Sequence, residues 1–262
     1  MNRIKYNEKK ILVTGSGSGL GKFLCKKLDA DDFSRKNATE FFTTNHNYDT
    51  IIHTAFNRSS NPLKSDFRSY LDDNIFLTER LTKIPHQKFI YISSIDIYPK
   101  DLPLVGEEDD FLVDGIGGWY GRSKLIAEEI VKKNCKNSLI LRPSAMIGKD
   151  SRENSLIKIL KNLPTKLTLS PYSSFNYILH DDVLSFIRKA VDQNLEGTFN
   201  LASSSNIDLQ TVVKKYDNKN IEFGEFLYKT QQLNNNKAKS VSDVFNKSSL
   251  DNIEIFKKMI SF

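Results

Sequence analysis

A glycine-rich turn near the start of the chain restricts its fold more than any other feature. The stretch "VTGSGSGLGK" (13–22) joins the apolar run "KILVTG" (10–15), which predicts a buried strand, to "LGKFLCKKL" (20–28), which predicts a helix. Glycine tolerates positive φ angles and lets backbone N–H groups approach a phosphate at a helix N-terminus. In a first strand–turn–helix unit, such a turn favours a dinucleotide site over a plain tight connection.

The spacing of these glycines is informative in itself. The pattern is T-G-x-x-x-G-x-G, through Thr14, Gly15, Gly19 and Gly21, and it departs from G-x-G-x-x-G because Leu20 stands where a glycine would fall. No lysine follows at the spacing of a P-loop, so the turn does not predict an ATPase.

Short apolar runs alternate with helical patterns up to about residue 150. The runs are rich in Ile and Leu without polar alternation, which indicates strands buried on both faces of a parallel sheet. The further strands expected are 49–56, 88–95 and 137–144, and the further helices are 39–45, 67–84 and 121–133. This order predicts a doubly wound, Rossmann-like α/β fold.

The pattern is looser after residue 150. The expected helices are 155–163, 182–193 and 251–260, the expected strands are 175–181 and 197–202, and the Asn- and Lys-rich stretch 228–243 predicts a mobile surface loop. We therefore assign residues 1–150, with 177–202 returning to them, to a dinucleotide-binding domain. Residues 151–176 and 203–262 form a small, interwoven substrate-binding lobe.

Composition narrows the choice of partners. The net charge of +6 suits an anionic partner, but the basic residues are scattered among acids, which favours a phosphate-bearing small molecule over a nucleic acid. Cys25 and Cys135 have no metal-ligand spacing, so we expect a reduced cytoplasmic protein without a metal site. The N-terminus is polar, unlike a signal peptide, and no apolar run approaches the roughly 18 residues of a membrane span.

A tyrosine and a lysine stand four residues apart in "GGWYGRSKLIAEE" (117–129). Positions i and i+4 share one helix face, so the Lys124 ammonium can lie near the Tyr120 ring. Taken alone, the pair is either a catalytic apparatus or two ordinary surface side chains.

The glycine turn followed by Y-x-x-x-K resembles the short-chain dehydrogenase/reductase superfamily. Five further stretches are similar to its extended branch, the NAD-dependent epimerase/dehydratases that act on nucleotide sugars. They are "YISSIDIYP" (91–99), "YGRSK" (120–124), "LILRPSAMIG" (139–148), "YILHDDV" (177–183) and "GTFNLASS" (197–204). The resemblance extends from about residue 10 to 205, with Ser18 in place of a glycine of the extended branch.

The resemblance implies a catalytic set of Ser94, Tyr120 and Lys124. Tyr120 would donate or accept the proton, Lys124 would activate it, and Ser94 would hydrogen-bond the substrate oxygen. A free tyrosine has a pKa of about 10, and a nearby ammonium and the cationic nicotinamide are expected to lower it. Asn74 and His180 are expected to support structure.

The resemblance also implies a bound NAD or NADP. The segment "DDFSRKN" (31–37) is similar to the segment at the adenine edge, and the strand that would end in a ribose-binding acid is reduced or lost. Arg35 or Lys36 could meet a 2′-phosphate or be solvated, so the cofactor stays open, with NADPH slightly favoured. The residues expected to bind it are Gly15, Ser16, Ser18, Gly19, Leu20, Gly21, Asp32, Phe33, Arg35, Ala55, Tyr120, Lys124, Pro143 and Ala145.

Four further side chains bear on the substrate. Asp96, two residues after Ser94, is either a second acid/base or a strand-end aspartate that hydrogen-bonds a turn. Lys149, Arg152 and Lys158 follow the region where relatives bind the substrate diphosphate, or they are solvated surface charges.

We therefore expect an NAD(P)-dependent oxidoreductase that reduces a nucleotide-linked 4-keto sugar for polysaccharide precursor synthesis. The alternative is a nucleotide-sugar epimerase or dehydratase with tightly bound NAD and Asp96 as an extra acid/base. A non-catalytic dinucleotide sensor is a third reading, which the intact Ser94, Tyr120 and Lys124 oppose. The resemblance also allows a homodimer.

Overall fold

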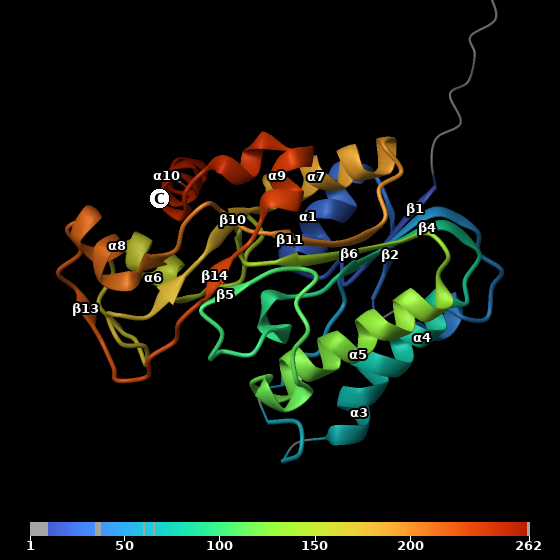
Figure 1. Ribbon diagram of the computed structural model, residues 1–262, viewed down its shortest axis with the longest axis horizontal. Coiled ribbons are helices and arrows are strands. Elements are labelled where there is room, and N and C mark those ends of the chain that lie inside the picture. The colour runs from blue at the N-terminus through green and yellow to red at the C-terminus, as the bar shows by residue number, and fades with distance from the viewer. Residues whose placement is uncertain (1–9, 35–37, 60, 65, 261–262) are drawn as a thin grey trace, which may run out of the picture.

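A parallel six-stranded sheet lies between two layers of helices in the computed structural model (Figure 1). The structure describes residues 10–34, 38–59, 61–64 and 66–260, so Arg35 and Lys36 lie outside it. The strand order is β11-β6-β4-β3-β1-β2. The bounds are β1 Ile11–Thr14, β2 Asp31–Phe33, β3 Tyr48–His53, β4 His86–Ile92, β6 Ser138–Pro143 and β11 Gly197–Leu201. The doubly wound α/β prediction is confirmed.

Both faces of this sheet are buried. Helices α1 (Gly19–Leu28) and α7 (His180–Asp192) cover one face, while α4 (Leu77–Thr82) and α5 (Gly118–Asn134) cover the other (Figure 1). Successive strand residues point to opposite faces. Leu12 and Val13 are accordingly both fully buried, in different core clusters, which explains why the strands lack polar alternation.

The region between α1 and β3 differs from expectation in two ways. The first three residues of the segment compared with an adenine edge form β2, which pairs directly with β1 through Asp31, Asp32 and Phe33. Helix α2 covers only Ala38–Phe41, shorter than the predicted 39–45. The Thr44 hydroxyl donates a 3.1 Å hydrogen bond to the Phe41 carbonyl and so satisfies the end of the helix early.

The long helix predicted over 67–84 contains a wider turn. It divides into α3 (Phe67–Leu71), a π-helical turn (Asp72–Phe76) and α4. Asn74, within the π turn, accepts from the Asn57 N–H at 2.7 Å and donates to the Asn57 carbonyl at 3.1 Å. Asn74 thus fixes the loop after β3, the structural role expected of it.

Short strands and helices form the rest of the molecule. β7 (Ala145–Ile147), which was not predicted, pairs with β10 (Tyr177–Leu179), and Asn176 separates β10 from β9 (Ser174–Phe175) within the predicted strand 175–181. Around them lie α6 (Ser155–Lys161), β8 (Thr165–Lys166), β12 (Ile207–Asp208), α8 (Leu209–Lys215), β13 (Ile221–Glu222) and α10 (Ser249–Met259). No helix in the described ranges is both long and apolar enough to cross a membrane.

The predicted mobile loop at 228–243 is wrong. β14 (Gln232–Leu233) in this stretch pairs with β5 (Leu104–Val105), and α9 (Asn236–Val241) follows it. Buried amides anchor the segment, because the Asn235 side chain donates to the Ala202 carbonyl and the Gln231 side chain to the Pro99 carbonyl. A polar composition therefore concealed an ordered segment.

Candidate active site

The glycine loop is packed so closely that its first and last glycines cannot carry side chains. A Cβ on Gly15, whose φ is +75°, would lie 2.8 Å from the Ala55 backbone, and a Cβ on Gly21 would lie 2.3 Å from the Gly15 carbonyl oxygen. The Thr14 hydroxyl accepts hydrogen bonds from the Thr54 and Ala55 N–H groups, both at 3.1 Å. These contacts join the carboxyl ends of β1 and β3.

One side of the same loop is open. An added Cβ on Gly17 or Gly19 would meet nothing within 4 Å, and Gly19 opens α1 with a φ of +59°. An open backbone at a helix N-terminus fits a pyrophosphate. Asp32, the middle residue of β2, accepts a 3.0 Å hydrogen bond from the Ser16 hydroxyl, so a carboxylate lies beside the loop.

The turn after β4 presents Ser94. Strand β4 ends at Ile92, and Ser94 caps a 3-10 helix over Ile95–Ile97 by accepting the Asp96 N–H at 3.1 Å. Helix α5 packs directly on this turn, because a Cβ on Gly121 would lie 2.1 Å from the Asp96 carbonyl oxygen. The close approach brings the Tyr120 hydroxyl near enough to Ser94 for the serine hydroxyl to act on the Tyr120 pKa.

Lys124 is buried one turn further along α5. Its ammonium donates a 2.7 Å hydrogen bond to the Ile92 carbonyl and lies 4.3 Å from the centre of the Phe56 ring. Burial lowers the Lys124 pKa to about 7, the positive charge of Arg58 acts in the same direction, and Glu128 opposes them.

The Tyr120 pKa moves in the opposite direction from the prediction. Burial raises it above its usual value, the Asp96 carboxylate raises it further, and Arg58 and the nearby Ser94 hydroxyl partly offset the rise. The hydrogen bond of the Lys124 ammonium goes to the Ile92 carbonyl. In the chain alone, Tyr120 is therefore held as a neutral phenol.

Asp96 is tied to two partners that sequence reasoning missed. Its Oδ1 atom lies 2.6 Å from the Lys100 Nζ atom and accepts a 3.0 Å hydrogen bond from the Tyr228 hydroxyl. The i, i+4 spacing of Asp96 and Lys100 could have indicated the first partner. Tyr228 lies 132 residues further along the chain, and no local pattern links it to Asp96.

The three basic residues that were expected to bind the substrate lie in different places. The Arg152 Nε atom donates a 2.9 Å hydrogen bond to the Ser18 hydroxyl, and the adjacent Asp150 carbonyl accepts the Gly19 N–H at 2.9 Å. Arg152 therefore lies against the glycine loop. Lys149 is exposed on the turn after β7, and Lys158 is half-buried on α6.

The last expected cofactor residues lie where β6 passes into β7. Pro143 ends β6, and Ala145 begins β7. Leu141 of β6 pairs with Ile92, so Pro143 and Ala145 follow at the same edge of the sheet as Ser94.

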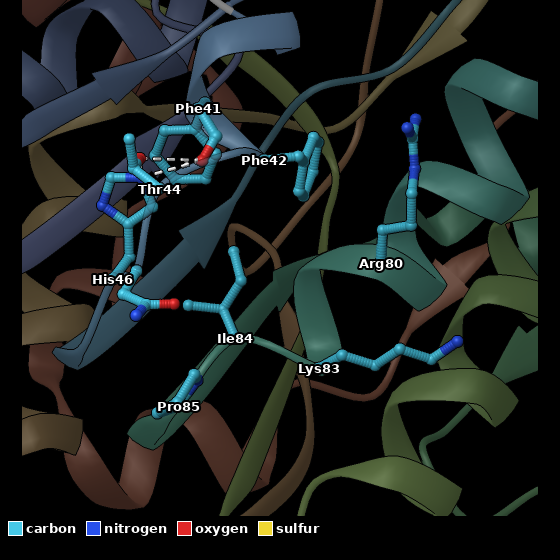
Figure 2. Close-up of a pocket in the computed structure, with 9 residues that line it drawn as sticks. Phe41, Phe42, Thr44, His46, Arg80, Lys83, Ile84 and Pro85 are labelled. Carbon is cyan, nitrogen blue, oxygen red and sulfur yellow. Dashed lines mark hydrogen bonds between the residues drawn. The ribbon is translucent and has the colours of Figure 1, made fainter.

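A cavity of about 390 Å³ lies at the opposite edge of the sheet (Figure 2). Phe41, Phe42, His46, Arg80 and Ile84 line it. His46 precedes β3 and Ile84 precedes β4, whereas Ser94 and Ala55 follow those strands. The length of a strand therefore separates this cavity from Ser94 and Ala55.

The sequence comparison identifies the family. The model of the NAD dependent epimerase/dehydratase family matches residues 25–202. The chain belongs to this family. The expectations of an enzyme and of an NAD or NADP cofactor are thereby confirmed. No curated protein sequence matches the chain.

Solved structures share the fold over nearly the whole chain. MoeE5 with UDP-glucose and NAD superposes with a TM-score of 0.81 at 16% identity, covering 95% of this chain and 98% of that one. UDP-glucuronic acid 4-epimerase from Bacillus cereus gives 0.75 at 18% identity, covering 96% and 98%. dTDP-4-dehydrorhamnose reductase from Bacillus anthracis, with NADP, gives 0.75 at 17%, covering 95% and 98%. At these identities the likeness concerns the fold.

Proposed function

We propose that the protein reduces the ketone of a nucleotide-linked 4-keto sugar, in the synthesis of a polysaccharide precursor. Ser94, Tyr120 and Lys124 are the proposed catalytic residues. The family includes enzymes that carry out several reactions at this type of site, so the residues around Ser94 must distinguish among them.

The observation that carries this proposal is the pairing of Asp96. Dehydration, or epimerisation next to a ketone, requires a base that removes a carbon-bound proton. The Asp96 Oδ1 atom already accepts from the Tyr228 hydroxyl and pairs with the Lys100 ammonium, so two donors occupy the oxygen that would have to take a carbon-bound proton. Reduction needs no such base, since one hydride and one proton complete it.

Each catalytic side chain has a role in that reduction. Bound NADH or NADPH supplies the hydride. As the carbonyl carbon is reduced, the Tyr120 phenol gives its proton to the carbonyl oxygen, and solvent returns one proton to the phenolate. The raised Tyr120 pKa keeps the donor protonated near neutral pH. Ser94 orients the oxygen, and the Lys124 ammonium favours the phenolate as it forms.

Asp32 bears on the choice of cofactor. An acid at the end of the second strand binds the ribose 2′-hydroxyl in many NAD enzymes, whereas it would repel a 2′-phosphate. Asp32 is the penultimate residue of β2 and lies beside the glycine loop, so we propose NADH as the preferred cofactor. The remaining contacts proposed for the cofactor are Gly15, Ser16, Ser18, Gly19, Leu20, Gly21, Phe33, Ala55, Pro143 and Ala145, with Lys149 and Lys158 proposed for the substrate.

The experiment follows the absorbance of NADH and of NADPH at 340 nm with dTDP-4-dehydrorhamnose as the probe. Oxidation that depends on the protein, with NADH preferred, is expected. A redox-neutral conversion of UDP-glucuronic acid, with NAD that co-purifies with the protein, would instead identify an epimerase. The Tyr120→Phe variant serves as the inactive control in both assays.

A further inference from the structure

Tyr228 reaches the active site from the C-terminal part of the chain and is held there firmly. Its backbone N–H donates to the Ser173 hydroxyl at 3.1 Å, and its carbonyl accepts the Ser174 N–H at 2.8 Å. Its ring stacks on that of Phe175, with centroids 4.9 Å apart and an interplanar angle of 20°. Backbone and ring are therefore both fixed before the hydroxyl makes any contact.

The hydroxyl completes a cluster around one carboxylate oxygen. Asp96 Oδ1 accepts the Tyr228 hydroxyl at 3.0 Å and lies 2.6 Å from the Lys100 ammonium. That ammonium also lies 5.1 Å from the centre of the Tyr228 ring. Tyr228 thus contacts both members of the Asp96–Lys100 ion pair. It holds the two side chains in one relative position, which the ion pair would not do without it.

The other side of Asp96 faces the catalytic serine. The Asp96 N–H donates to the Ser94 hydroxyl oxygen at 3.1 Å, and the Ser94 hydroxyl lies 3.5 Å from Asp96 Oδ2. Ser94 in turn lies close enough to the Tyr120 hydroxyl to lower its pKa. Hydrogen bonds therefore connect Tyr228 through Asp96 to Ser94, which lies beside the proposed proton donor.

We infer that Tyr228 is a positioning residue that, together with Lys100, fixes the Asp96 carboxylate so that it orients Ser94. This inference deepens the proposed function and rests on it for the reaction involved. Two positively charged groups face the cluster. Lys100 pairs with Asp96, and Arg58 acts electrostatically on Tyr120. By anchoring Asp96, the C-terminal lobe takes part in the chemistry as well as in binding the substrate.

The test is a double-mutant cycle on the full chain. Tyr228→Phe removes the hydroxyl and keeps the ring on Phe175. It is made in the wild-type and in the Asp96→Ala background. Tyr172→Phe, on a side chain that is 65% exposed, is the matched control. The readouts are kcat and KM for dTDP-4-dehydrorhamnose with NADH, the dissociation constant of NADH, and urea unfolding.

A positioning role predicts an effect on kcat that depends on Asp96. We expect Tyr228→Phe to lower kcat by about tenfold, the loss of one well-placed hydrogen bond to a charged group. KM and the NADH dissociation constant should change by less than about twofold. In the Asp96→Ala background, the same change should have almost no further effect. An equal loss in both backgrounds, or no loss in the wild type, would overturn the inference.

Urea unfolding separates failure of this inference from failure of the proposed function. The Tyr228–Asp96 contact predicts non-additive unfolding, with a coupling of at least about twofold in the folding constant. If no 4-keto sugar is reduced but the coupling is present, the proposed reaction fails and the positioning of Asp96 by Tyr228 stands. If unfolding is additive, the contact does not exist and the inference fails, whatever the reaction.

Discussion

The first half of the molecule, which carries the glycine loop and runs to about residue 150, and the C-terminal lobe contribute residues to the candidate active site in different ways. In the first half, successive βα units deliver the glycine loop, Ser94 and Tyr120 to one edge of a parallel sheet. In the lobe, two-residue strands such as β9 and β14 pair with partners far away in the sequence. Tyr228 belongs to a segment whose composition is typical of a loop. The comparison teaches that a repeated unit positions residues predictably, whereas long-range pairing does not.

The contacts of Asp96 show where the two regions meet. Lys100 comes from the same turn as Asp96, while Tyr228 comes from the lobe. If the comparison is sound, changes in the first half should affect the chemical step and the cofactor most. Changes in the loops that lead into the lobe should have smaller and more selective effects.

The largest effect is expected for Tyr120→Phe. The change removes the proposed proton donor but leaves the ring against Phe56, whose ring centroid is 5.0 Å away. The rate should fall about a hundred- to ten-thousandfold, the usual worth of a positioned acid. Near wild-type turnover, with NADH affinity and circular dichroism unchanged, would show that the first half does not hold the chemistry.

The next effect concerns stability and its dependence on pH. The Lys124 pKa is lowered from 10.5 to about 7, so between these values the unfolded chain binds more protons than the folded one. Wild-type stability should therefore rise with pH across that window, and the full cost of burying the charge is present below it. At 1.36 kcal/mol per pH unit the cost is on the order of 5 kcal/mol.

Lys124→Met should remove that dependence on pH. The free energy of unfolding of both proteins is measured in urea from pH 6 to 10. The variant's value should exceed that of the wild type by the largest margin at low pH, and the margin should shrink as pH rises. Loss of the hydrogen bond to the Ile92 carbonyl adds an offset that does not depend on pH. Parallel curves for the two proteins would contradict a buried ammonium in the fold.

A smaller effect is expected for Gly19→Val, which tests the loop as a cofactor site. The side chain would occupy the open face of the loop at a φ of +59°. NADH affinity, measured by fluorescence titration, should fall at least about tenfold, because the branched side chain would fill the space where the pyrophosphate approaches the backbone N–H groups. Gly197→Val is the matched control, since its φ of +90° gives similar strain at the start of β11. That variant should lose stability and keep its NADH affinity.

The smallest effect is expected for Arg152→Met. Arg152 lies on the glycine loop through Ser18, so its charge should aid the cofactor pyrophosphate more than the substrate diphosphate. The dissociation constant of NADH should rise about two- to fivefold, which is the usual size of an exposed ionic contact. The dissociation constant of UDP should not change. The control is Lys166→Met, on an exposed lysine paired with Glu222. The opposite pattern, with weaker UDP and unchanged NADH, would return Arg152 to the substrate.

The sequence predicted features that depend on local chemistry. The glycine turn, the apolar strands and the Tyr120–Lys124 spacing each lie within one βα unit, so the pattern alone placed them. The direction of the Tyr120 pKa was not predictable, because it depends on burial and on the distance to Asp96. The order within 228–243 was also hidden, since the side chain of Asn235 is buried by partners such as Ala202, far away in the chain.

The most direct test of the proposed reduction follows hydrogen isotopes. With dTDP-4-dehydrorhamnose and 4-deuterated NADH in water, deuterium should appear on C4 of the product sugar, as NMR or mass spectrometry would show. With unlabelled NADH in deuterium oxide, the carbons of the sugar should gain no deuterium beyond a control without protein. Solvent deuterium on a carbon next to C4 that requires the protein, and that is lost in Asp96→Asn, would contradict the account and make Asp96 the base of a different reaction.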